Sequence, residues 1–361
     1  MIRSLVLSLA VSGLSACALP LEREPDAPGT SPAEIGPEPV RPPRLSPHHG
    51  SAWHESQGFV VHEWGTFTSV LASDGSRLPG LHHEEEDLPG FVADRMAQAE
   101  DTPGVVSQKM ETPVTYFYSP RARTVTAAVH FPKGIFTQWY PYVRATAPAL
   151  YLAESGIIDP WLWTDAPVPT QCVPRFAAGF RDGLLDWGEV EVLPPHDSAA
   201  LPGPLGDTTW RFARNTRANP LRLTGPKGDV QTEKFLFYRG LGDFELPLRA
   251  TLTGDGTATS VSVSSARGTL GALLLMRVEA DGAGFVELGD VAEGQTLTSA
   301  VPAPTLTHGA FVAALKERLV AALVGDGLYA DEAQAMVDTW ERSYFLTPGV
   351  RLLYLLPQAQ T

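Results

Sequence analysis

The chain has 361 residues, with 27 Lys and Arg against 41 Asp and Glu, so its formal net charge at pH 7 is −14. This excess of acid argues against a nucleic-acid partner, because phosphate binding requires clustered Lys and Arg. The charge is compatible with cations, basic proteins or neutral glycans.

The first predicted element is a secretory leader. One basic residue, Arg3, precedes an apolar run from Leu5 to about Gly13, which is too short to span a bilayer as a permanent helix. The run ends in Leu-Ser-Ala-Cys17, which resembles the bacterial lipobox, in which cleavage precedes an acylated cysteine. We predict a signal peptide over residues 1–16 and lipid on Cys17, with a buried N-terminal helix as the alternative. Loss of Arg3 would take the net charge from −14 to −15.

A proline-rich tether follows the leader, over residues 17–50. Nine prolines fall between Ala18 and Gly50, and this density favours extended polyproline II, with a reach of about 100 Å. Asp after the lipidated cysteine tends to retain lipoproteins at the inner membrane, and here Ala18 takes that place. The resemblance to lipoproteins therefore implies an exported protein anchored at the outer membrane. With lipid on Cys17, Cys172 is left alone and no intrachain disulfide forms.

Residues 51–300 are predicted to be a β region. Residues 114–118 and 124–131 flank Ser-Pro-Arg-Ala-Arg and are typical of a hairpin, with His130 facing away from Val125, Ala127 and Val129. Further strands are expected over 188–193, 208–214, 219–224, 234–239, 246–253, 258–265, 270–279 and 284–290. Short strands separated by turn signals predict a mainly β fold of antiparallel sandwiches, as one large sandwich or two packed ones.

Residues 301–361 are predicted to form a helical hairpin and a final strand, packed on the β region. Phe311, Leu315, Leu319 and Leu323 recur at helical spacing, with Thr307 as N-cap and Gly325 as the stop. A second helix places the following residues on one face: Ala333, Met336, Val337, Trp340 and Tyr344. Residues 350–356 are apolar enough for a buried strand.

His62 and Glu63 stand side by side in VVHEWGTF. The metalloprotease pattern His-Glu-x-x-His fails, because Thr66 stands where the second histidine is needed. The segment has the composition of a strand, in which neighbouring side chains point to opposite faces. We therefore predict that His62 and Glu63 are not a dyad, and each of them could be a satisfied core residue.

A second concentration of potential ligands is HHEEED, over residues 82–87. His82 and His83, with His62 and Glu111, would make a mixed nitrogen and oxygen site of the kind that Zn²⁺, Mn²⁺ or Fe²⁺ accepts. Nothing in the spacing forces these residues together, and a solvated acidic loop is the alternative. If the site forms, a divalent transition metal is its cofactor.

Aromatic residues cluster beside prolines in two segments, FTQWYPY and DPWLWTD. Exposed rings at Trp139, Tyr140, Trp161 and Trp163 could stack on sugars or hold a partner protein. The alternative is that the tryptophans fill the core between sheets, since large aromatic side chains are mostly buried.

Four segments, HEWGTFT, KMETPVTYFY, KFLFYRG and EAQAMVDTWERSYF, precede the last apolar strand. In this combination the chain resembles a group of exported bacterial proteins without an assigned function, over most of residues 59 to 357. The resemblance implies that the segments belong to one folding unit, and it supplies no catalytic residues.

Two functions from different classes fit these observations. The first is a lipid-anchored envelope protein whose β-rich domain is structural or binds a glycan or another envelope protein. The alternative is a metal-dependent hydrolase or oxidoreductase, with His62, His82, His83 and Glu111 as ligands and Glu63 as a base. In that case metal-bound water would be the nucleophile.

Overall fold

The computed structural model describes residues 58–78, 87–94, 106–148, 181–225, 228–254 and 259–356. It also gives the backbone of the strands β1 (Leu5–Ser12), β8 (Leu150–Leu152), β9 (Gly156–Ile157) and β10 (Pro174–Phe176). Strands β10, β8 and β9 form a small sheet of their own.

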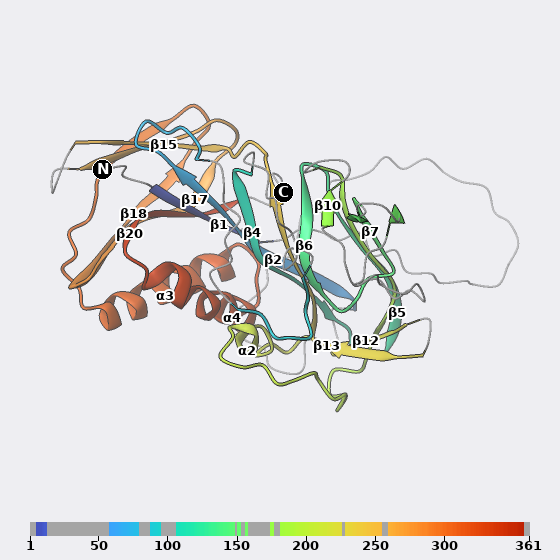
Figure 1. Cartoon of the computed structure of the whole chain (residues 1–361). Helices are drawn as coiled ribbons and strands as arrows, with labels where there is room; N and C mark the ends of the chain where they lie inside the picture. The colour runs from blue at the N-terminus through green and yellow to red at the C-terminus, as the bar shows by residue number, and fades with distance from the viewer. Residues whose placement is uncertain are drawn as a thin grey trace, which may run out of the picture.

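A nine-stranded sheet forms the centre of the molecule (Figure 1). In spatial order its strands are β18 (Gly282–Val291), β17 (Leu270–Glu279), β20 (Gly349–Leu356), β1, β2 (Val60–Leu71), β4 (Gln108–Tyr118), β14 (Phe235–Gly242), β6 (Gly134–Tyr140) and β3 (Ala93–Asp94). Its neighbours pair antiparallel except β1 and β20, which are parallel. The predicted leader segment Leu5–Ser12 is therefore a strand between β2 and β20 in the full-length chain.

Two smaller sheets cover one face of the large sheet. One contains β13 (Val230–Glu233), β12 (Leu221–Thr224), β11 (Gly183–Val192) and β5 (Arg123–Phe131), with β7 (Ala145–Ala147) also paired to β11. The other contains β15 (Leu248–Thr253), β16 (Ser260–Ser265) and β19 (Thr296–Ala300). Each has its own apolar core against the large sheet, which explains why two sandwiches form.

The helices cover the opposite face, as the lower part of Figure 1 shows. They are α2 (Trp210–Ala213), α3 (His308–Gly325), α4 (Ala330–Trp340) and the π-helical turn η1 (Glu341–Phe345). Thr307 caps α3 by accepting a hydrogen bond from the Ala310 amide, as the sequence predicts. Strands buried on both faces alternate between cores: Leu274 and Met276 face the helices, and Leu273 and Leu275 face the small sheet.

The main fold prediction is confirmed: the protein is mainly β, with antiparallel sandwiches, a C-terminal helix pair and a last strand that returns into the sheet. Two local predictions are wrong. Residues 114–118 and 124–131 form no hairpin, because β4 belongs to the large sheet and β5 pairs with β11 in the sheet facing it. Residues 208–214 include α2 in place of a strand, because Trp210 and Ala213, one helical turn apart, both enter the core under the helices.

Candidate functional site

The strand β2 carries His62 and Glu63 to opposite faces of the large sheet, as predicted. His62 points to the helix layer, where it bonds to Glu332 of α4. Glu63 points to the five-stranded small sheet, where it accepts a hydrogen bond from the Tyr238 hydroxyl. The two residues therefore form no dyad, and both have a protein partner.

Glu63 is a buried acid between two sheets. Its side chain is 4 % exposed, and burial raises its pKa from 4.5 to about 7 despite the hydrogen bond from Tyr238, which lowers it. The pKa of Tyr238 is raised well above its usual value, first by burial and then by the charge of Glu63. Both groups are thus driven towards their neutral forms.

Glu332 is the centre of a polar cluster at the start of α4. Its buried carboxylate accepts hydrogen bonds from His62 Nδ1 at 2.8 Å, from the Tyr118 hydroxyl at 2.7 Å and from the Tyr329 amide at 2.8 Å. Burial, and then the charge of Glu332, raises the pKa of Tyr118 well above its usual value, so its hydroxyl remains a donor. With Nδ1 bonded to the carboxylate, Nε2 is the ring nitrogen that is left for a further hydrogen bond.

The helix α4 runs along β2 in the same direction, and their contacts recur regularly. His62 bonds to Glu332, Thr66 accepts from the Trp340 indole at 2.7 Å, and Thr68 bonds to the Tyr344 hydroxyl at 2.7 Å. Four residues of an α-helix rise about 6 Å, and two residues of a strand rise about 6.6 Å. Every fourth residue of α4 can therefore contact every second residue of β2. The segments HEWGTFT and EAQAMVDTWERSYF therefore pack along each other. We call this row of contacts, from His62 and Glu332 to Thr68 and Tyr344, the seam.

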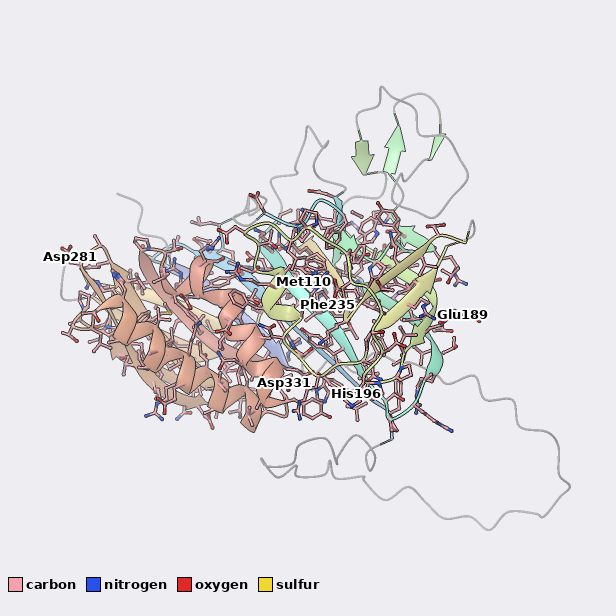
Figure 2. The ribbon with its side chains drawn as sticks, turned by 90° about the horizontal axis from the view of Figure 1, so that it is seen from below. Met110, Glu189, His196, Phe235, Asp281 and Asp331 are labelled. Carbon is pink, nitrogen blue, oxygen red and sulfur yellow. The ribbon has the colours of Figure 1, made fainter. Side chains whose placement is uncertain are left out.

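Four side chains surround the outer end of this seam, and we call them the His62 surface: His62, Arg217, Tyr329 and Asp331. The His62 and Tyr329 rings lie 4.4 Å apart at 38°. Arg217 holds Asp331 through Nε and Nη2, each at 3.2 Å, and through its backbone amide at 2.7 Å. Figure 2 shows Asp331 where the helix layer meets the remaining strands. His62 is 19 % exposed, and its Nε2 has no hydrogen-bond partner within the described ranges.

Glu111 lies at another point of the seam. It accepts a hydrogen bond from the Tyr344 hydroxyl at 2.8 Å and lies 3.4 Å from Lys109 Nζ. Glu111 is on β4, where it pairs with Thr66 of β2, whereas His62 of β2 pairs with Tyr116 of β4. Four strand residues separate the two positions by about 13 Å. The structure therefore does not bring His62 and Glu111 to one ion, since metal ligands lie about 2 Å from their metal.

The remaining predicted site residues have two outcomes. Trp139 and Tyr140 are buried in the core, 0 % and 3 % exposed, so the structure does not present them for stacking on a ligand. Cys17, Cys172, His82, His83, Trp161 and Trp163 lie outside the described residues. In the part of the chain that is described, no group of three His, Cys, Asp or Glu side chains gathers to hold a metal.

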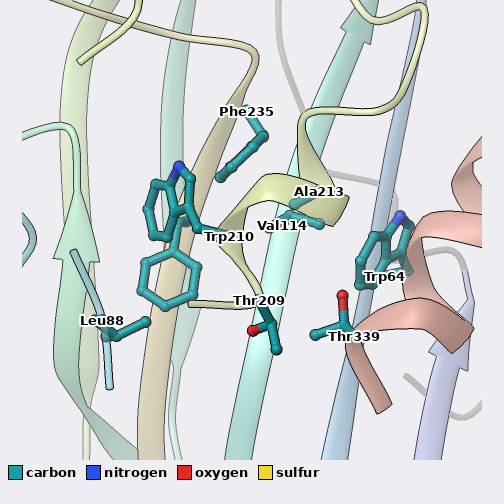
Figure 3. A pocket seen from close by; sticks show the side chains of 9 residues that line it. Trp64, Leu88, Val114, Thr209, Trp210, Ala213, Phe235 and Thr339 are labelled. Atoms are coloured by element: carbon teal, nitrogen blue, oxygen red, sulfur yellow. The ribbon is translucent and has the colours of Figure 1, made fainter. Parts of the chain in front are cut away.

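A pocket lies between α2, α4 and the helix side of the sheet (Figure 3). Its walls are mainly apolar and include Trp64, Trp210, Phe235, Phe237 and Thr339. The cavity volume is about 20 Å³, which holds about one or two water molecules. The pocket is therefore a packing gap and not a substrate site.

No family model, no curated protein and no solved structure matches the chain. Among the described helices, none has the length and apolar character needed to cross a membrane. The site must accordingly be interpreted from its own chemistry.

The residues that sequence reasoning missed are Tyr118, Arg217, Tyr238, Tyr329 and Glu332. One of them left a signal. The buried face of α4 includes Met336 and Trp340, and one turn before Met336 that face begins with Glu332. An acid on a buried stripe requires hydrogen-bond partners, and His62 is one of the three that Glu332 has.

Proposed function

We propose that the protein is a lipid-anchored component of the bacterial envelope, held at the outer membrane through Cys17, and that its β-rich domain binds another envelope component. The observation that carries the anchoring is the leader followed by Leu-Ser-Ala-Cys17 and nine prolines before the folded region. Such a tether would hold the domain at a distance from the lipid surface.

The fold supports a binding role for the domain. Helices and two small sheets cover both faces of the large sheet, so the scaffold is rigid. Rigid elements position polar surface groups well for recognition. On this scaffold the His62 surface holds two rings and an ion pair in a fixed arrangement.

Fractionation and mass spectrometry test the anchoring. We expect the wild-type protein in the outer-membrane fraction, with an N-terminal peptide that begins at an acylated Cys17. The Cys17→Ala chain should lose the lipid and leave the membrane fraction, whereas Cys172→Ala, the matched control, should not. A wild-type protein that retains residues 1–16 and carries no lipid would contradict the proposal.

A second candidate function is metal-dependent catalysis. The observation that favours it is the carboxylate behind His62, because histidines that bind metals usually donate their other ring N–H to a carboxylate or carbonyl. In this case His62 Nε2 would be one ligand, and His82 and His83 remain its proposed companions.

Metal content tests this second candidate. The processed chain, purified without a His tag, is compared with the His62→Ala, His82→Ala, His83→Ala triple variant by inductively coupled plasma mass spectrometry. Near-stoichiometric metal in the wild type, lost in a folded variant, is the result expected for a metal site. Equal metal content in both, after incubation with Zn²⁺, Mn²⁺ and Fe²⁺, would rule these ligands out.

A further inference from the structure

The His62 surface offers a ligand three kinds of contact. His62 Nε2 is a hydrogen-bonding atom at the protein surface, and the bond between Nδ1 and Glu332 fixes the ring. Tyr329 is half-buried beside it and contributes an aromatic ring. Arg217, with a side chain 46 % exposed, and Asp331, at 20 %, contribute donors and acceptors that are already held by each other.

The charge of this surface selects among ligands. Asp331 and Glu332 bring two carboxylates to this surface, against the guanidinium of Arg217 and the ammonium of Lys234, whose charge interacts with that of Asp331. Two carboxylates therefore face two cations on this surface, in a protein whose overall charge is −14. A surface whose charges are already balanced within the protein matches a neutral ligand better than an ionic one.

The apolar surface argues against a protein partner here. Among the described residues the exposed large apolar side chains are Val230, Leu306 and Leu346. They lie on three separate parts of the chain: β13, the segment before α3, and the segment after η1. A stable protein interface is usually built around a desolvated apolar or aromatic centre. None of the three belongs to the His62 surface.

From these contacts we propose that the His62 surface binds a neutral saccharide. A sugar hydroxyl, which both donates and accepts, can bond to His62 Nε2. A second hydroxyl can bond with the Arg217 and Asp331 pair, and the C–H face of the sugar ring can lie against Tyr329. The inference rests on the proposed binding function, and it names the surface and the class of ligand.

Protection of His62 from chemical modification tests the proposal. The processed lipidated chain, in a detergent without a sugar headgroup, is treated with diethylpyrocarbonate in the presence of maltotetraose or the tetramer of N-acetylglucosamine. Modification of each histidine is followed by peptide mass spectrometry. His130, which is exposed on β5, is the internal control. One of the two sugars is expected to protect His62 and leave His130 equally reactive.

Affinity measurements by isothermal titration calorimetry complete the test. Arg217→Gln should weaken sugar binding by about tenfold, whereas Arg222→Gln, which breaks the exposed ion pair with Glu191, should leave it unchanged. Circular dichroism checks that both variants fold. The protection result in the wild type needs no variant and decides the matter if Arg217→Gln does not fold.

The negative outcomes are distinguishable. A sugar that binds with His62 and His130 modified equally would overturn the site and leave the binding function standing. If neither sugar binds at concentrations on the order of 10 mM, which corresponds to very weak affinity, the saccharide proposal is overturned. The membrane anchoring is decided separately by the fractionation of Cys17→Ala.

Discussion

Glu63 and Tyr238 share a hydrogen bond in the core between the nine-stranded sheet and the five-stranded small sheet. The glutamate comes from the strand that also carries His62, and the tyrosine from KFLFYRG. Because burial favours the neutral carboxylic acid, this pair makes the stability of the fold depend on pH.

The first prediction concerns Glu63→Gln. The folded pKa, about 7, lies above the unfolded value of 4.5, so the folded state holds its proton more strongly. The contribution of protonated Glu63 to the free energy of unfolding is complete below pH 4.5 and is lost as the pH rises through 7. Between pH 5 and pH 8 this acid should cost the wild type about 2 to 3 kcal/mol of unfolding free energy, and the amide should remove that loss.

Urea unfolding at both pH values measures this effect. Glu189→Gln, an exposed position on β11, is the matched control and should follow the wild type. A Glu63→Gln variant whose unfolding free energy falls with pH as steeply as that of the wild type would show that Glu63 does not cause the dependence.

Glu332→Gln should destabilise the protein by about 3 kcal/mol at neutral pH, since a buried acceptor of three hydrogen bonds is replaced by a group that offers one oxygen. Thermal or urea unfolding measures the change. Glu317→Gln, exposed on α3, should stay within about 0.5 kcal/mol of the wild type. Equal stability of the two variants would contradict the conclusion that the three hydrogen bonds to Glu332 stabilise the contact between α4 and β2.

A double-mutant cycle tests the seam at Thr66 and Trp340. Both side chains are buried, and Thr66→Val leaves the Trp340 indole N–H without its acceptor. The cycle with Trp340→Phe should give a coupling energy of about 1 kcal/mol. Trp187→Phe, which removes a bond to the Pro141 carbonyl in the other core, should combine additively with Thr66→Val. Zero coupling at Thr66 and Trp340 would contradict the contact.

Gly65 is predicted to tolerate no side chain. A Cβ there would lie 2.9 Å from Pro113 Cα, at the register shift between β2 and β4. Gly65→Ala should therefore cost about 1 to 3 kcal/mol through overpacking. In α3 a Cβ at Gly309 meets nothing within 4 Å, so Gly309→Ala should be neutral or stabilising. The pair is compared by urea unfolding, and equal effects would contradict the tight contact at Gly65.

Local periodicity was sufficient to predict much of the fold. The spacing of Phe311, Leu315, Leu319 and Leu323 predicts α3, and the observed cap and end agree with Thr307 and Gly325. Alternation along β2 likewise predicts that His62 and Glu63 face opposite ways. These properties depend on neighbours in sequence, which a single chain displays.

Pairing between distant segments was not predictable in the same way. Residues 114–118 and 124–131 have the pattern of a hairpin, yet the chain passes from one sheet to the facing one between them. The bond between His62 and Glu332 joins positions 270 residues apart. Only the acid on the buried stripe of α4 indicated that such a partner was needed, and it did not indicate which residue.

The helix layer has a mechanical consequence for β1. One apolar cluster joins Leu353 and Leu355 of β20, on one side of β1, to Trp64 and Tyr116 on the other side, through the residues of α3 and α4. The helices α3 and α4 thus pack against the strands on both sides of β1 and hold them together. If the predicted leader is cleaved, the sheet loses a central strand and its hydrogen bonds to both neighbours. The strands on either side of β1, from β20 to β18 and from β2 to β3, would then remain joined through their contacts with the helices.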